Sequence, residues 1–450
     1  MSARRRLPGV LIRPGAVKEA REAAGLSLAQ IAGSEVTRAA IHLIESGRAK
    51  PSLPVLEAIA TRTELPLRAF AADEDILAAR GTSLESVAMD LSRLERSYEM
   101  DDYAGTLAKA TELLDQLTGL RFEFRARYWR ARAATMTGDT TTALIEIDHC
   151  IAFYRDEGDL LQLAKCLDCK GCALYVTQDA GAADVFLAAI RELDRVQPDP
   201  FDVRMRILSH LGSLYVETHD FERAITTLDR AVSVAEGLVD LGRIGGLYDN
   251  LGLAYSEVGQ TARALEYAHK AVALHRTRND LLALANAENN LGYLLLTKGE
   301  SRAAEPRIRA SLKIYSDLGV ERRRAHPLLS LAELQLRDGD MEGAARSALA
   351  ARELADRLGE KLNSAVAAQI LARVAEASGS TAEADRLFLA AISILSSGNA
   401  RDRLVEVHTA YAKVLELRGA DKAAMGQFKA ALAASLGFDS STDNSQESSA

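Results

Sequence analysis

Residues 25–60 read GLSLAQIAGSEVTRAAIHLIESGRAKPSLPVLEAIA, and this stretch decides the fold of the N-terminal part of the chain. Ser27 and Thr37 are of the types that cap helices, and each precedes a run in which apolar residues recur at helical spacing. Gly33 lies between these two runs, and a further helical run follows Ser52. Short helices with a tight glycine-containing turn between them are typical of a helix-turn-helix.

Helices on either side complete a small helical head. The pattern predicts helices over 15–24, 28–32, 37–47, 52–63 and 67–71. The residues that set the pattern are Gly25-Leu26-Ser27, Ile31-Ala32, Val36-Thr37, Ile41, Ile44-Glu45-Ser46-Gly47, Pro51-Ser52-Leu53, Leu56 and Ile59-Ala60. With these residues the segment resembles the XRE family, the DNA-binding domain of phage repressors and many bacterial regulators. The resemblance implies a lambda-repressor-like domain of five helices over residues 13–72.

The resemblance also implies how the head meets double-stranded DNA. The third helix of the family enters the major groove with its N-terminal half against the base edges. Arg38 is then placed for a bidentate contact with guanine, although a solvated helix residue is the alternative. Glu45 is predicted to be a cap or an ion-pair partner. The residues implied to meet bases are Arg38, Ala39, Ala40, His42 and Leu43, and those implied to meet phosphates are Ser27, Thr37, Arg48 and Lys50.

Charge separates the head from the rest of the chain. Residues 1–72 hold 11 Lys and Arg against 6 Asp and Glu, a net charge of +5, whereas the remaining residues carry −13. A basic head on an acidic body indicates that only the head meets a polyanion. Residues 1–12 are predicted to be a flexible basic arm, 73–82 a linker, and the Ser-rich stretch 437–450 a disordered tail.

Residues 83–436 repeat a pattern about every 40 residues. A small residue, usually preceded by Leu, is followed 12 residues later by Ala, as in Leu211-Gly212 with Ala224. These small anchor residues are Ser92, Ala131, Gly171, Gly212, Gly252, Gly292, Ala332, Ala372 and Ala412. The pattern resembles a long form of the tetratricopeptide repeat. The resemblance implies an all-α chain in which a right-handed superhelix of about nine helix pairs follows the head.

Such a superhelix supplies a binding surface, an inner groove lined by the first helix of each pair. The polar and aromatic residues predicted for this groove are Arg125, Trp129, Arg132, Lys165, Asp168, Arg206, His210, Asp249, Asn250, Asn286, Asn289, Asn290, Tyr293 and Glu333. Asparagine amides donate and accept together, which suits the backbone of an extended peptide. The same architecture resembles the RRNPP family of peptide-sensing regulators. The alternatives are that Asn250 and Asn290 make local contacts, and that Trp129 packs the first turn of the groove.

The four cysteines lie within 23 residues, as Cys150, Cys166, Cys169 and Cys172. The spacing of three among Cys166, Cys169 and Cys172 could indicate a metal or redox site. Inside a helix, however, residues three apart drift around the axis and converge poorly on one ion. Packing is therefore the preferred interpretation, and thiol or metal sensing stays open.

No nucleotide-binding, metalloprotease or serine-hydrolase motif occurs in the sequence, which therefore predicts no enzyme and no cofactor. The sequence holds no apolar run of the roughly 20 residues that span a bilayer, and no signal peptide, so a cytoplasmic protein is expected. The prediction is a homodimeric transcriptional regulator whose groove binds a short signalling peptide or another small effector, as in quorum sensing. The alternatives are a scaffold that tethers a protein partner to DNA, and a cysteine-based redox or metal sensor.

Overall fold

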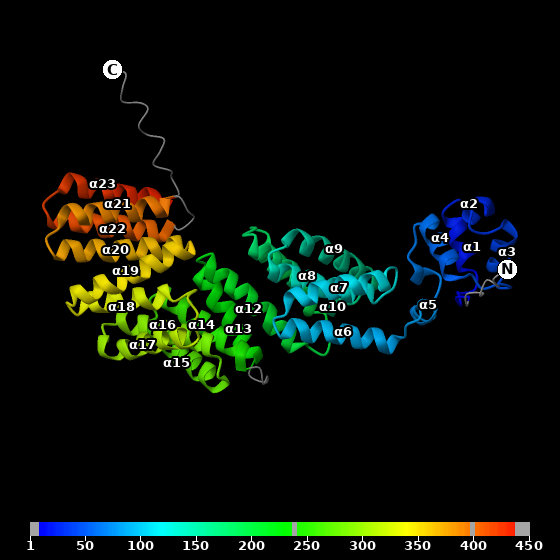
Figure 1. Cartoon of the computed structure of the whole chain (residues 1–450), viewed down its shortest axis with the longest axis horizontal. Helices are drawn as coiled ribbons and strands as arrows, with labels where there is room; N and C mark the ends of the chain where they lie inside the picture. The colour runs from blue at the N-terminus through cyan, green and yellow to red at the C-terminus, as the bar shows by residue number, and fades with distance from the viewer. Residues whose placement is uncertain (1–8, 236–240, 397–400, 437–450) are drawn as a thin grey trace, which may run out of the picture. The chain divides into compact units, whose positions relative to one another are not determined.

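The computed structural model describes residues 9–235, 241–396 and 401–436. These residues form an all-helical chain (Figure 1). The chain divides into two compact units between Leu214 and Tyr215, and the head belongs to the first unit. The predicted all-α class is confirmed. Residues 1–8 of the predicted basic arm and the predicted tail 437–450 lie outside the described residues.

The head contains the five predicted helices. They are α1 (Ala16–Ala23), α2 (Leu28–Ala32), α3 (Arg38–Glu45), α4 (Leu53–Thr63) and the 3-10 helix η1 (Leu67–Ala69). Ser27 begins α2 with a capping box, since its hydroxyl accepts from the Gln30 amide and the Gln30 side chain accepts from the Ser27 amide. Gly33 ends α2 at a positive φ of 58°, which glycine adopts most readily and which turns the chain toward α3. The two helices are therefore set by their own caps and turn.

Both flanks of the head are more ordered than the sequence predicts. Within the predicted linker, α5 (Asp73–Arg80) forms a helix whose Ile76 and Leu77 are completely buried. At the end of the predicted flexible arm, Val10 is buried and its amide donates to the Pro51 carbonyl at 2.8 Å. Burial of these apolar side chains fixes both segments on the head.

The rest of the described chain consists of nine successive helix pairs, as predicted (Figure 1). The pairs are α6 (Leu84–Glu99) with α7 (Tyr103–Leu117), α8 (Glu123–Thr137) with α9 (Thr140–Glu157), α10 (Leu160–Val176) with α11 (Ala182–Leu193), α12 (Phe201–Glu217) with α13 (Phe221–Ala235), α14 (Leu241–Glu257) with α15 (Thr261–Arg278), α16 (Leu281–Thr297) with α17 (Ser301–Asp317), α18 (Ala325–Arg337) with α19 (Met341–Leu358), α20 (Lys361–Ala377) with α21 (Thr381–Ser396), and α22 (Arg401–Leu417) with α23 (Asp421–Leu436). Within the described ranges, no helix combines the length and apolarity that crossing a bilayer demands.

Small anchor residues let the two helices of a pair approach closely. A Cβ atom on Gly171 would lie 2.6 Å from the Phe186 ring, and one on Gly292 would lie 2.6 Å from Cγ1 of Ile308. The anchor of the first repeat, Ser92, is instead exposed, as is its partner Ala104. The first pair therefore keeps the helices of the pattern without its tight crossing.

Candidate functional site

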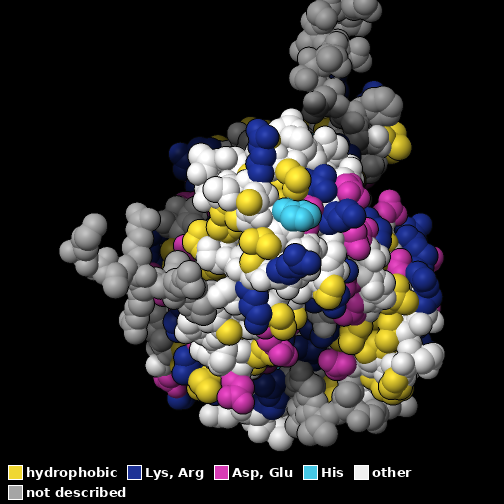
Figure 2. Space-filling view, turned by 90° about the vertical axis from the view of Figure 1, so that its right-hand side faces the viewer, with side chains coloured by type: hydrophobic (Ala, Val, Ile, Leu, Met, Phe, Trp, Pro, Cys, Tyr) yellow, Lys and Arg dark blue, Asp and Glu magenta, His cyan; other side chains and the backbone are white. Residues whose placement is uncertain are grey.

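The exposed side of α3 is the first candidate site. Ile41 and Ile44 are buried against the head, whereas Arg38, Ala39 and Leu43 point away from its core and are exposed. The other residues predicted to meet DNA are also exposed, apart from the half-buried Ala40; they are Ser27, Thr37, His42, Arg48 and Lys50. Figure 2 shows the end of the molecule that carries the head, where basic and hydrophobic side chains and a histidine share one face. The residues predicted to meet DNA are therefore accessible to a partner, apart from the half-buried Ala40.

The positive charges on this face lack ion-pair partners in the part of the chain that the structure describes. Among the described residues, Arg38, Arg48 and Lys50 have no ion-pair partner. Glu45 instead accepts from Nε of Arg21 at 2.6 Å, which confirms its predicted role as an ion-pair partner. The free cations leave α3 and the following turn suited to an anionic partner.

A second ion pair, which the sequence analysis missed, braces the turn before α3. Arg62 of α4 pairs with Glu35 in the turn, and its Nη1 donates to the Ile31 carbonyl at 3.1 Å. These contacts tie α4 to the end of α2, so they fix the angle at which α3 leaves the turn. Charged residues 27 positions apart carry no local sequence signal.

The second candidate site lies on the first helices of four successive pairs in the first compact unit. We call it the basic–aromatic cluster, and it comprises Tyr98 of α6, Tyr128, Trp129 and Arg132 of α8, Lys165 and Asp168 of α10, and Arg206 and His210 of α12. The sequence predicts most of these residues for one groove face. Tyr98 is an addition, because it falls outside the repeat positions used for that prediction.

Arg132 holds the aromatic half of the cluster together. Its Cζ lies 4.2 Å from the ring centroid of Tyr98 and 5.2 Å from that of Trp129. The Tyr98 and Trp129 rings are themselves 5.5 Å apart. A guanidinium over aromatic faces is attracted by the ring quadrupoles, and this contact fixes the plane of its donors. Trp129 is buried, so its packing role is present whether or not a ligand contacts it.

Asp168 connects the charged residues of the basic–aromatic cluster. Its carboxylate accepts from Nε of Arg206 at 2.9 Å and from Nδ1 of His210 at 2.7 Å. Burial alone would raise the Asp168 pKa, but His210 and then Arg206 hold that pKa well below its usual range. Burial likewise opposes protonation of His210, yet the Asp168 carboxylate outweighs it and raises the His210 pKa to about 10. Asp168 is therefore a carboxylate and His210 an imidazolium at neutral pH.

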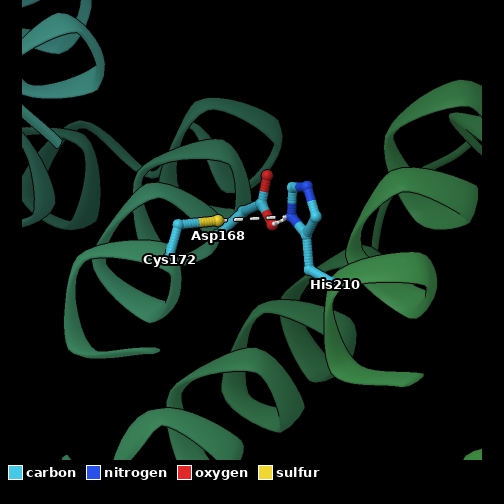
Figure 3. A group of neighbouring side chains, drawn as sticks. All are labelled: Asp168, Cys172 and His210. Atoms are coloured by element: carbon cyan, nitrogen blue, oxygen red, sulfur yellow. Dashed lines mark hydrogen bonds and ion pairs between the residues drawn. The ribbon is translucent and has the colours of Figure 1, made fainter. Parts of the chain in front are cut away.

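Cys172 of α10 reaches the same histidine (Figure 3). Its Sγ lies 3.3 Å from Nδ1 of His210, and the donor atoms of Asp168, Cys172 and His210 lie within 4.8 Å of one another. A metal ion would need a neutral imidazole and a thiolate. Here His210 is protonated, and burial raises the pKa of the Cys172 thiol above its ordinary value. The chemistry of this group fits a hydrogen-bonded ion network better than a metal centre.

The other cysteines take no part in this group. Cys150, Cys166 and Cys169 are buried, and Sγ of Cys150 donates to the Phe124 carbonyl at 3.3 Å. Burial raises the pKa of Cys169 to about 12, which removes the thiolate needed for redox chemistry. Their environment favours the packing interpretation.

The remaining groove predictions lie elsewhere. Arg125 of α8 is exposed, and seven belong to the second compact unit. Asp249 lies 2.8 Å from Nε2 of His275, Asn286 accepts from the Tyr315 hydroxyl at 2.6 Å, and Glu333 accepts from Arg373 at 2.6 Å. The other four are the half-buried Asn250 and Asn289 and the exposed Asn290 and Tyr293.

Protonation of His210 makes a testable contribution to stability. A pKa raised from an ordinary value of 6.5 to about 10 means that the folded protein holds this proton more tightly than the unfolded chain. The stabilisation of the folded protein by this bound proton is complete below pH 6.5, declines above pH 6.5, and is lost as the pH rises through about 10. We therefore expect the stability difference between wild type and His210→Gln, measured by urea unfolding, to shrink from pH 6.5 to 10. A difference that stays constant over this range would contradict the assignment.

Comparisons with known proteins agree with this architecture. The chain matches the helix-turn-helix domain family over residues 15–71 and tetratricopeptide repeat families over residues 206–237 and 247–282. No curated protein matches the chain.

Several solved structures resemble the chain over about three quarters of its length. The apo form of RapI has a TM-score of 0.64 at 14% identity, covering 78% of this chain and 97% of its own. A Rap protein complexed with Competence and Sporulation Factor has a TM-score of 0.60 at 13% identity, with coverages of 78% and 98%. Aspartyl phosphate phosphatase F from Bacillus subtilis has a TM-score of 0.56 at 10% identity, with coverages of 78% and 94%. At these identities the likeness concerns the fold alone. The chain thus joins a helix-turn-helix domain to a tetratricopeptide-repeat domain with the fold of the Rap proteins.

Proposed function

We propose that this protein is a sequence-specific DNA-binding transcriptional regulator, not an enzyme, whose repeats bind an effector that changes its affinity for its operator. The observation that carries the proposal is the exposed surface of α3 and of the turn after it, where Arg38, Arg48 and Lys50 form no ion pair with any described residue. Unpaired cations on and directly after the second helix of a helix-turn-helix suit phosphate and base contacts in a major groove. The protein acts as a cytoplasmic homodimer, since a two-fold pair of heads reads two half-sites.

The effector is proposed to be a short peptide. One protein of similar fold, a Rap protein, has been solved in complex with Competence and Sporulation Factor, which supports an effector for this chain. In this chain the basic–aromatic cluster offers charged donors beside aromatic faces on helices of the first unit. Such mixed surfaces suit a peptide, which presents both polar backbone and apolar side chains.

Contacts within the first unit connect this cluster to the head. The Arg68 guanidinium of η1 lies 5.3 Å from the Phe124 ring centroid and 4.9 Å from that of Phe153, and these two rings stack at 3.8 Å. The Arg68 amide also donates to the Gly119 carbonyl at 3.1 Å. Phe124 lies on α8, the helix that carries Trp129 and Arg132. A ligand that moves α8 therefore changes the surface on which the head rests, which gives effector and operator binding a physical link.

The proposal is tested in two steps. Selection from random duplex DNA with the full chain should enrich one sequence with two related half-sites. Binding to that operator is then measured with and without fractionated peptides from the source organism, and one fraction should change both the operator affinity and the melting temperature. Failure to enrich any sequence would refute sequence-specific binding, and a lack of response to every fraction would refute the peptide effector.

A further inference from the structure

We propose that the basic–aromatic cluster recognises a carboxylate group on the effector, with Arg132, Lys165 and His210 as the donors. The inference rests on the proposed function, because it names the chemistry by which the repeats would hold their ligand. The bound effector would then have an anionic group that lies against α8, α10 and α12.

The cluster carries an excess of positive charge. Arg132, Arg206 and His210 act on one buried carboxylate, that of Asp168, and Lys165 lies near Arg206. Among the described residues, neither Arg132 nor Lys165 forms an ion pair. Burial, and then the nearby Arg206, lower the pKa of Lys165, whereas Asp202, Glu95 and Asp159 raise that pKa without forming an ion pair. An anion bound here would pair with Arg132 and Lys165.

The hydrogen-bond donors of the cluster also exceed its acceptors. Asp168 uses one oxygen for His210 and the other for Arg206, so it has little capacity for a further cation. Nη2 of Arg206 is buried without a hydrogen-bond partner within the described part of the chain. Arg206 therefore serves to hold Asp168, and Asp168 in turn keeps His210 protonated. The imidazolium side chain remains 35% exposed, with Nε2 as its second donor.

The shape of the donor set fits a carboxylate as well. Tyr98, Tyr128 and Trp129 surround the Arg132 guanidinium, whose Cζ lies 4.2 to 5.7 Å from their ring centroids. A guanidinium held on ring faces keeps its planar fork of N–H donors oriented, and this fork matches the two oxygens of a carboxylate. A peptide carries a carboxylate either at its C-terminus or on an acidic side chain.

Trp129 makes the test direct, because it is the only tryptophan in the chain and its ring lies 5.2 Å from Arg132. The full chain is titrated with N-acetylleucine, which mimics a peptide C-terminus, and with N-acetylglutamic acid α-amide, which mimics an acidic side chain. N-acetylleucinamide is the matched neutral probe, and inorganic phosphate tests for a general anion site. Tryptophan emission and melting temperature are followed together, so that a changed baseline in Arg132→Gln does not hide binding.

We expect a saturable response to one carboxylate probe and none to the amide. Lys165→Gln removes a side chain that forms no ion pair, so it should fold, and it should raise the dissociation constant at least about tenfold, as should Arg132→Gln. Arg191→Gln, an exposed residue on α11, should leave it unchanged. An equal response to the amide, a response to phosphate alone, or no saturable response would overturn the proposal. These outcomes are separable from failure of the proposed function, in which carboxylate probes bind but no peptide fraction alters operator binding.

Discussion

Asp168→Ala is expected to lower the free energy of unfolding of the first compact unit by about 3–5 kcal/mol. The Asp168 side chain is 5% exposed and accepts hydrogen bonds from both Arg206 and His210. Its removal leaves two partly buried cations facing each other without a counterion. Removing one partner of a buried ion pair costs more than the pair itself contributes, because the charge that remains is desolvated and unpaired.

Urea unfolding followed by Trp129 emission measures this effect, because Trp129 lies in the same unit. Asp148→Ala is the matched control, since Asp148 pairs with Lys170 at 2.8 Å but is 55% exposed. An exposed pair contributes at most about 1 kcal/mol, so the control should change stability little. Equal losses in the two variants would show that Asp168 is not the centre of a buried network.

The helices of both domains could be predicted because their signals are local. Ser27 and Thr37 cap their helices through hydrogen bonds to residues three positions along, and the repeat anchors recur at a fixed interval. The α5 helix was predicted as a linker instead, because its first turn, Asp73-Glu74-Asp75, is polar. Its two buried residues, Ile76 and Leu77, become evident only when the surface that they pack against is known.

Each candidate site also has features that the sequence predicts and contacts that it does not. The residues of α3 that the family resemblance implies for DNA contact are exposed, apart from the half-buried Ala40. The repeat interval likewise placed Arg132, Asp168 and His210 on successive first helices. It could not show that Asp168 bonds both Arg206 and His210, nor that Asn286 bonds Tyr315. Which polar groups pair is decided by side-chain reach across neighbouring helices, and a single sequence carries no record of that.

Arg38→Ala is expected to weaken binding to the selected operator by about 1–3 kcal/mol, a loss of about 5- to 150-fold. Arg38 begins α3, is exposed and has no ion-pair partner in the described chain, so the free protein should keep its melting temperature. A guanidinium at this position reaches two acceptors on the major-groove edge of guanine, and alanine leaves both unbonded. The effect should therefore fall on the operator and spare unrelated DNA.

Lys50→Ala is the control that distinguishes a contact with a DNA base from a contact with a DNA phosphate. Lys50 is exposed after α3, in a position suited to a phosphate. Its loss should weaken operator and unrelated DNA alike and reduce the slope of log affinity against log salt by about one. Titrations of both DNAs at several salt concentrations give all of these quantities. If Arg38→Ala behaved as Lys50→Ala does, Arg38 would be a phosphate contact, and α3 would lie in the groove at a different angle from the one that its family resemblance implies.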